Sequence, residues 1–187
     1  MKYILINGKK RAGKDFFASL LYAELVRAGY TVAVLSFADP IKDIMSVALN
    51  CTHDELNEFK NNKAPIYIQN KHVSDARQVL QNFGTEAMKK YFGEDVWVNL
   101  LRSRAEKTNA DIIIVPDFRF FSEHLPGSTT VRVLNRDISS TSDAHRSENE
   151  LNEFKFDYEL DNTGYCLGAR DAKELALEIG GTLNTHF

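Results

Sequence analysis

The segment that most constrains the fold lies at the N-terminus, in KYILINGKKRAGKDFFASLL. An apolar run, Tyr3–Ile6, leads directly into the loop Gly8–Lys14, and a helical pattern follows at once. The loop has the spacing of a glycine, four further residues and then Gly-Lys. Between a strand and a helix, such a loop lets backbone N–H groups and the helix N-terminus wrap a phosphate. The segment therefore predicts a phosphate-binding loop (P-loop) on a buried strand of an α/β fold.

The residues of this loop differ in what each can do. The two glycines permit a tight approach of the backbone, Lys14 can bridge the outer phosphates as an exposed loop lysine, and the other basic residues add local positive charge. The alternative is a solvated basic turn between a strand and a helix. We expect these residues to bind nucleotide: Gly8, Lys10, Arg11, Ala12, Gly13, Lys14, Asp15 and Phe16.

Asp15 stands where a P-loop usually has a serine or threonine hydroxyl for Mg²⁺. A carboxylate is a harder, charged oxygen ligand that can hold the metal directly or through water. It also repels phosphate unless neighbouring cations offset it, as Lys9, Lys10 and Arg11 can. The alternative is that Asp15 only caps the following helix.

Along the remaining chain, strand-like and helical patterns alternate, which predicts a mostly parallel sheet with right-handed crossovers. Two polar stretches, Thr52–Ser74 and Arg136–Phe154, resemble linkers, and in a sheet enzyme such insertions hold substrate covers and lids. Five strands are expected, at Tyr3–Ile6, Thr31–Phe37, Asp111–Val115, Thr130–Leu134 and Asp157–Leu160. Beyond the helix that ends at Gly29, we expect helices over Pro40–Leu49, Asp75–Tyr91, Val96–Lys107 and Ala172–Ile179.

Composition sets limits on the class of protein. The net charge of -3 gives no global reason to expect nucleic acid as a partner. Two cysteines, Cys51 and Cys166, are too few for a disulfide framework and favour a reducing interior. The N-terminal apolar run is too short for a signal peptide, and no later run could span a membrane. We therefore expect a cytoplasmic protein with one domain over 1–187.

Several further segments carry a resemblance to a known family. Beside GKKRAGKD they are ADPIKDIM at 38–45, ARQVLQNFGTEAMKKYFGEDVWVNLL at 76–101, IIIVPDFR at 112–119, NRD with SDAHRSE between 135 and 148, and DYELDNTG. On these segments the chain resembles the bacteriophage-type deoxynucleoside monophosphate kinases of the P-loop kinase group. The segment RQVLQNFGTE with the following tryptophan is the most specific, because it is no general property of P-loops.

The resemblance implies a three-layer P-loop kinase fold with a parallel sheet of about five strands. It implies a substrate cover inserted at about 40–107 and a short lid at about 136–154. The activity implied is ATP-dependent phosphorylation of deoxynucleoside monophosphates to diphosphates, which supplies DNA precursors, with ATP as donor and Mg²⁺ as cofactor. For a phage protein the location would be the host cytoplasm. Family members suggest a homodimer, although the sequence does not fix the oligomeric state.

Residue roles follow from the same resemblance. Arg77 and the turn Gly84-Thr85 are expected at the phosphate of the monophosphate substrate, Trp97 near its base or sugar, and Ile41 and Lys42 on the other side. Asp117 resembles an acidic residue that anchors metal, its water shell or the substrate sugar, and Glu123 is also placed at the substrate. One departure is Phe16, which stands where family members often have threonine, so that only its backbone N–H remains for the α-phosphate.

Phosphoryl transfer brings several anionic oxygens together and needs convergent cations. The candidates are Lys14, Arg119, Arg136 and Arg146, with Arg77 on the substrate side. Pro116 ends an apolar run, so Asp117 should emerge where a strand leaves the sheet. The predicted metal ligands are Asp15 and Asp117. His145 is expected to be a lid or structural residue, because transfer from a nucleotide needs no histidine intermediate.

Two alternatives remain at this level. One is another small-molecule P-loop kinase, since animal-type phosphomevalonate kinase has a similar basic loop ending in Gly-Lys-Asp. The other is a non-catalytic module that holds ATP as a structural or regulatory ligand. Such a non-catalytic module would be expected to lack Asp117, Arg119 or the lid arginines, and all of these are present.

Overall fold

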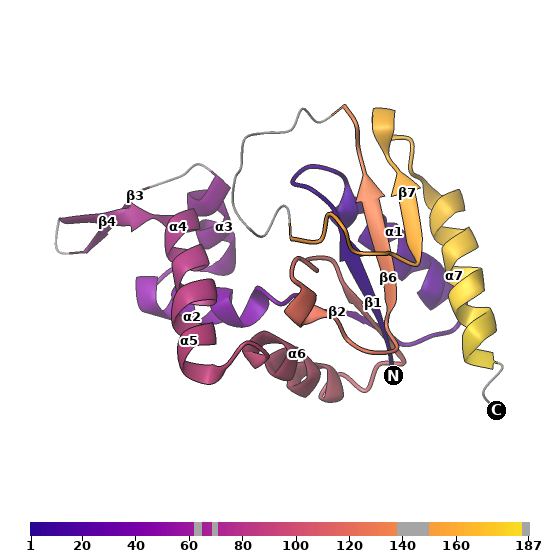
Figure 1. The fold of residues 1–187 in the computed structure, drawn as a ribbon, viewed down its shortest axis with the longest axis horizontal. Helices are drawn as coiled ribbons and strands as arrows, with labels where there is room; N and C mark the ends of the chain where they lie inside the picture. Colours follow the sequence, from indigo (N-terminus) through magenta and orange to yellow (C-terminus); the bar gives the residue numbers. More distant parts are fainter. Residues whose placement is uncertain (62–64, 69–70, 138–149, 185–187) are drawn as a thin grey trace. The chain divides into compact units, whose positions relative to one another are not determined.

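The computed structural model describes residues 1–61, 65–68, 71–137 and 150–184 (Figure 1). The chain forms two compact units, one comprising Met1–Ser36 with Leu101–Phe187 and the other Phe37–Leu100. The first unit contains the sheet and is called the sheet unit below. The second is called the helical unit.

A parallel sheet organises the sheet unit. Its strands are β1 (Lys2–Asn7), β2 (Val32–Val34), β5 (Ile112–Val115), β6 (Thr129–Leu134) and β7 (Tyr158–Asp161). The order across the sheet is β2-β5-β1-β6-β7, and every neighbouring pair is parallel. The predicted parallel α/β sheet of five strands is confirmed. Because all strands run the same way, their carboxyl ends share one edge, with β1 in the centre.

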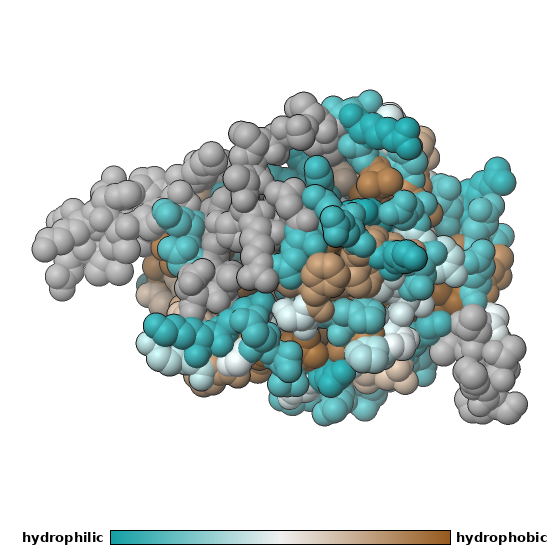
Figure 2. All heavy atoms as spheres, viewed as in Figure 1, coloured by the Kyte–Doolittle hydropathy of each residue, from teal (hydrophilic) through white to brown (hydrophobic). Residues whose placement is uncertain are grey.

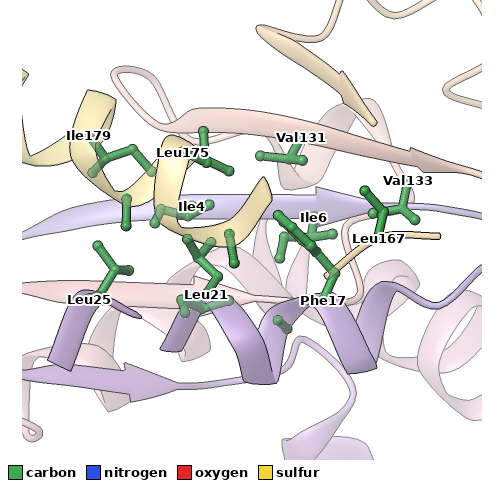
Figure 3. Packing of buried hydrophobic residues seen from close by; sticks show 14 of the residues in the cluster. Ile4, Ile6, Phe17, Leu21, Leu25, Val131, Val133, Leu167, Leu175 and Ile179 are labelled. Atoms are coloured by element: carbon green, nitrogen blue, oxygen red, sulfur yellow. The ribbon is translucent and has the colours of Figure 1, made fainter. Parts of the chain in front are cut away.

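Two helices cover one face of this sheet. They are α1 (Lys14–Arg27) and α7 (Ala169–Asn184), which pack against each other as well as on the strands. Figure 3 shows the core between them, with Ile4 and Ile6 of β1 facing Phe17 and Leu21 of α1. Burying each such aliphatic or aromatic side chain contributes about 1.5–3 kcal/mol.

The other face of the sheet is covered as well. All four residues of β5 are buried, which is typical of a parallel strand with helices on both sides. The helix α6 (Val96–Glu106) buries Leu101 and Ala105. Its Arg102 and Glu106 act electrostatically on Tyr3, whose pKa is raised mainly by burial of the phenol. These electrostatic interactions indicate that this part of α6 lies near Tyr3, on the face of the sheet toward which the Tyr3 side chain of β1 points.

The helical unit contains more regular structure than predicted. The expectation of a linker over Thr52–Ser74 is wrong, because this stretch holds a helix and a hairpin. Thr52 and Glu55 explain the helix, since Glu55 Oε2 accepts the Thr52 N–H at 2.8 Å and Thr52 Oγ1 accepts the Glu55 N–H at 3.2 Å. This is a capping box, and Leu56 behind it is buried. The elements are α2 (Asp39–Leu49), α3 (His53–Asn61), the antiparallel pair β3 (Pro65–Ile68) and β4 (Lys71–Asp75), α4 (Ala76–Gln81), a π-helical segment (Asn82–Met88) and α5 (Lys89–Phe92).

Other boundaries also differ from the prediction. Asp75 closes β4 instead of opening a helix, and the strand expected over Thr31–Phe37 is only Val32–Val34. The predicted lid lies mainly at 138–149, outside the described residues. Its C-terminal end is described, and there Arg132 donates to the Leu151 carbonyl at 3.0 Å while Phe154 packs edge-on against Phe118 with ring centroids 5.4 Å apart.

Within the described residues, no helix is both long and apolar enough to cross a membrane. Figure 2 shows hydrophilic and hydrophobic side chains interspersed on the described part of the face it presents. Single exposed apolar residues of this kind are ordinary on a protein surface.

Candidate functional site

The loop after β1 is shaped by two glycines. A Cβ on Gly8 would lie 2.8 Å from the Val133 carbonyl oxygen of β6, so a side chain there would force the loop away from the sheet. Gly13 has φ 94°, a left-handed conformation that other residues adopt at a cost, and it is the N-cap of α1. The loop is therefore held close over the carboxyl end of the central strand.

The tip of this loop is a tight turn. The Ala12 N–H donates to the Lys9 carbonyl at 3.0 Å, and Arg11 between them has φ 68°. A left-handed conformation in a residue other than glycine costs roughly 1–2 kcal/mol, and such residues cluster at functional sites. The turn therefore brings the chain tightly round just before the start of α1.

Lys14 is the first residue of α1 and is only 9% exposed. The expectation of an exposed loop lysine is therefore wrong, because the helix begins at this residue and draws its side chain against the protein. Its Nζ lies 4.0 Å from Asp15 Oδ2. A largely buried ammonium needs anionic or polar groups around it, and the Asp15 carboxylate is one such group.

Asp15 projects to solvent, with 81% of its side chain exposed. The capping alternative for this residue is wrong, because the N-cap position is taken by Gly13 and no side-chain cap hydrogen bond forms. A carboxylate in the first turn still interacts favourably with the helix dipole. Phe16 beside it is more than half exposed, and its ring is not part of the core.

Asp117 follows β5, the strand directly beside β1, and it leaves the sheet after Pro116 as predicted. The Ser36 hydroxyl, beyond the end of β2, donates a hydrogen bond to Asp117 Oδ2. The Asn7 side chain at the end of β1 donates to the Phe118 carbonyl at 2.8 Å. Ser36 and Asn7 were not predicted, and together they fix the segment of Asp117 beside the P-loop strand.

Arg119 lies two residues further along and is partly buried. Glu123 accepts its backbone N–H at 2.7 Å and that of Phe120 at 3.0 Å, and Glu123 is only 5% exposed. The Glu123 carboxylate therefore shapes the turn that carries Arg119. Its predicted contact with substrate stays a prediction.

Arg136 stands beyond the end of β6 with 78% of its side chain exposed. Its Nε lies 3.5 Å from Asp161 Oδ2, at the end of β7, and its backbone N–H donates to Thr163 Oγ1 at 3.1 Å. Hydrogen bonds from Thr163 lower the pKa of Asp161, and the Arg136 charge lowers it further. The segments after β6 and β7 are therefore joined at the same edge of the sheet as the P-loop.

The predicted acceptor residues lie in the helical unit, where α2, α3 and α4 pack against one another. Ile41 and Lys42 are on α2, and the Lys42 ammonium is 3.9 Å from Asp39. Trp97 is buried near the start of α6. Arg77 belongs to α4, and Gly84 and Thr85 to the π-helical segment. Arg146 and His145 lie outside the described residues.

No group of three or more His, Cys, Asp or Glu side chains that could hold a metal is found in the part of the chain that the structure describes. In phosphoryl transfer, Mg²⁺ is usually held by one or two carboxylates together with phosphates and water. Asp15 and Asp117 offer hard oxygen donors of that kind at the carboxyl edge of the sheet. The donor set therefore fits Mg²⁺ that arrives with a nucleotide.

Comparisons with known proteins give a distant fold likeness. No family model and no curated protein matches the chain. Among solved structures, two of cobyrinic acid a,c-diamide synthase from Mycobacterium smegmatis are similar, one with bound ADP and magnesium and one with a bound ATP analog and magnesium. Each is 14% identical, with TM-scores of 0.44 and 0.45, and the matches cover 95% of this chain and 81% and 82% of the synthase chains. These ligands belong to the synthase.

Proposed function

We propose that this protein transfers a phosphoryl group from ATP to deoxynucleoside monophosphates. The observation that carries the proposal is the loop of Gly8 and Gly13 after the central strand, with the buried Lys14 at its end and Asp117 just beyond the adjacent strand β5. Ligands of open α/β sheets bind outside the carboxyl ends of the strands, where the direction of the connections changes. The chain leaves β1 toward β2 at one edge of the sheet, and it leaves β6 toward β7 at the other edge. The direction of the connections therefore changes between β1 and β6.

The sheet unit would bind the donor. Backbone N–H groups of the loop and the first turn of α1 would hold the phosphates, with Lys14 at the outer ones. Asp15 and Asp117 would hold Mg²⁺, which when bound neutralises phosphate charge. Arg119 and Arg136, with Arg146 of the proposed lid, would oppose the charge that develops on the transferred group.

The helical unit would bind the acceptor. This assignment rests on the family resemblance of the segment at 76–101, which contains Arg77, Gly84, Thr85 and Trp97. Ile41 and Lys42 lie on α2, which packs with α4 in the same unit. An arginine can bind a terminal phosphate through two parallel hydrogen bonds, so Arg77 is the residue proposed for the acceptor phosphate.

The experiment that tests the function is ADP release from ATP and Mg²⁺ with each deoxynucleoside monophosphate in turn. We expect ADP release that requires the presence of a deoxynucleoside monophosphate. Turnover with phosphomevalonate and none with nucleotides would assign the alternative kinase class. ATP binding without turnover on any acceptor would favour a binding module. Absence of ATP binding would contradict the P-loop assignment itself.

Arg77→Ala should weaken acceptor binding selectively. We expect the KM for the monophosphate to rise by about tenfold or more while the affinity for ATP stays nearly unchanged, because a charge-assisted contact to one substrate is lost. Steady-state kinetics with each substrate varied in turn measure the two effects. Arg170→Ala, on the exposed part of α7, is the matched control. A loss of ATP affinity with an unaffected acceptor would reverse the division of the site.

Asp15→Asn should change the requirement for metal. The substitution keeps the size and one oxygen but removes the charge, so we expect a lower kcat and a higher Mg²⁺ concentration at half-maximal activity. Nucleotide binding without metal should be unchanged or tighter, because a repulsive charge near phosphate is gone. Activity titrated against Mg²⁺ measures the shift, with Asp54→Asn on α3 as control. An unchanged titration would remove Asp15 from the metal site.

A further inference from the structure

Asn162 is a buried polar residue directly after β7, and both ends of its side chain are hydrogen-bonded. Only 2% of the residue is exposed. Its Nδ2 donates to the Ala12 carbonyl of the P-loop at 2.8 Å, and its Oδ1 accepts the N–H of Leu167 at 3.1 Å. The side chain therefore ties the P-loop to the segment that leads into α7.

The contact with the loop is close as well as polar. A Cβ placed on Gly13 would lie 2.2 Å from Asn162 Nδ2, so the amide occupies the space that any side chain at this position would need. Asn162 itself is held by the sheet, since its backbone N–H donates to the Leu134 carbonyl of β6 at 2.6 Å. The amide is thus a fixed group against which the Ala12-Gly13 peptide rests.

We propose that Asn162 is a positioning residue for phosphate binding by the P-loop. The carbonyl of Ala12 and the N–H of Gly13 belong to one planar trans peptide and point in opposite directions. By holding the carbonyl, Asn162 turns the Gly13 N–H away from itself and into the loop. This orientation is one that a phosphate-binding loop requires of its N–H groups.

The turn that begins at Asn162 also joins the P-loop to the segment of Arg136. Thr163, the next residue, accepts the Arg136 N–H, and the Gly164 N–H donates to Asp137 Oδ2 at 2.6 Å. One short turn, Asn162–Gly164, therefore contacts both the loop proposed for the donor phosphates and the segment that leads into the proposed lid.

The test separates positioning from stability. Asn162→Asp keeps the shape and the acceptor for the Leu167 N–H but sets a carboxylate oxygen against the Ala12 carbonyl. Asn162→Ala removes both bonds without burying a charge, and it serves as the second variant if the first does not fold. The matched control is Ile179→Ala in the α7 core, a buried residue placed well along the helix from the loop. Calorimetry measures the dissociation constants for ATP and ADP with Mg²⁺, and thermal unfolding measures stability.

We expect both Asn162 variants to weaken ATP and ADP binding by about tenfold, because each loses the hydrogen bond to the Ala12 carbonyl that holds the loop peptide. Ile179→Ala should lower the unfolding temperature without changing either constant. Wild-type affinity in a folded Asn162 variant would overturn the proposal, and so would equal losses of affinity in the control. The inference rests on the ATP binding in the proposed function, and failure of the wild-type protein to bind ATP would contradict that function instead.

Discussion

Lys14→Met is expected to lower kcat by on the order of 10³-fold while the protein stays folded. The ammonium is the group proposed to meet charge on the transferred phosphoryl, so its loss removes stabilisation that matters most in the transition state. Methionine has a similar length and no charge. Because Lys14 is only 9% exposed, the unfolding temperature must be measured beside the activity, so that loss of turnover is not mistaken for loss of the fold.

The measurement is ADP release together with thermal unfolding of the same preparation. Lys173→Met, on an exposed position of α7, is the matched control and should leave both unchanged. A folded Lys14→Met protein with near-normal activity would contradict the P-loop assignment. A protein that loses activity only because it unfolds would show a lowered unfolding temperature, which the expected result excludes.

The central strand, the loop and α1 could be predicted because their signals are local. An apolar run, two glycines at fixed spacing and a helical face all lie within the first 27 residues. The all-apolar run of β5 was equally clear, since a strand buried on both faces needs no alternation. Packing of α1 on the sheet then follows from Phe17, Leu21 and Leu25 on one helical face.

The groups that support the site could not be predicted, because they act across long separations in the chain. Asn7 reaches the Phe118 carbonyl over 111 positions, Ser36 reaches Asp117 over 81, and Asn162 reaches Ala12 over 150. Each is a small polar residue at a strand end, where many such residues serve only as turns. What distinguishes these three is the order of the strands in the sheet.

The missed helix α3 has a different cause. Thr52 and Glu55 have the spacing of a capping box, so a local signal was present. It was outweighed by the polar composition that follows, which resembles a linker. The buried Lys14 was missed for a related reason, because the charge of a residue predicts exposure and the geometry of a helix start overrides it.

The second large loss of activity is expected when the charge of Asp117 is removed. It follows the strand beside β1 and is held by the Ser36 hydroxyl, so its carboxylate has a defined direction. Asp117→Asn keeps an oxygen that can accept the Ser36 hydrogen bond while removing the charge. We expect kcat to fall by on the order of 10²-fold, because a charged group that organises metal or substrate in the transition state is lost.

The two roles proposed for Asp117 give different kinetics. If the carboxylate holds Mg²⁺ or its water, Asp117→Asn should raise the Mg²⁺ concentration at half-maximal activity and leave the KM for the monophosphate unchanged. If it binds the substrate sugar, that KM should rise with an unchanged Mg²⁺ titration. Ser36→Ala should show the same pattern with a smaller loss, since the carboxylate remains but its orientation is less restricted. An Asp117→Asn enzyme with wild-type kcat would contradict a role for Asp117 in the reaction. A larger loss of kcat in Ser36→Ala than in Asp117→Asn would contradict it as well, because a residue that only orients the carboxylate cannot contribute more than the carboxylate itself.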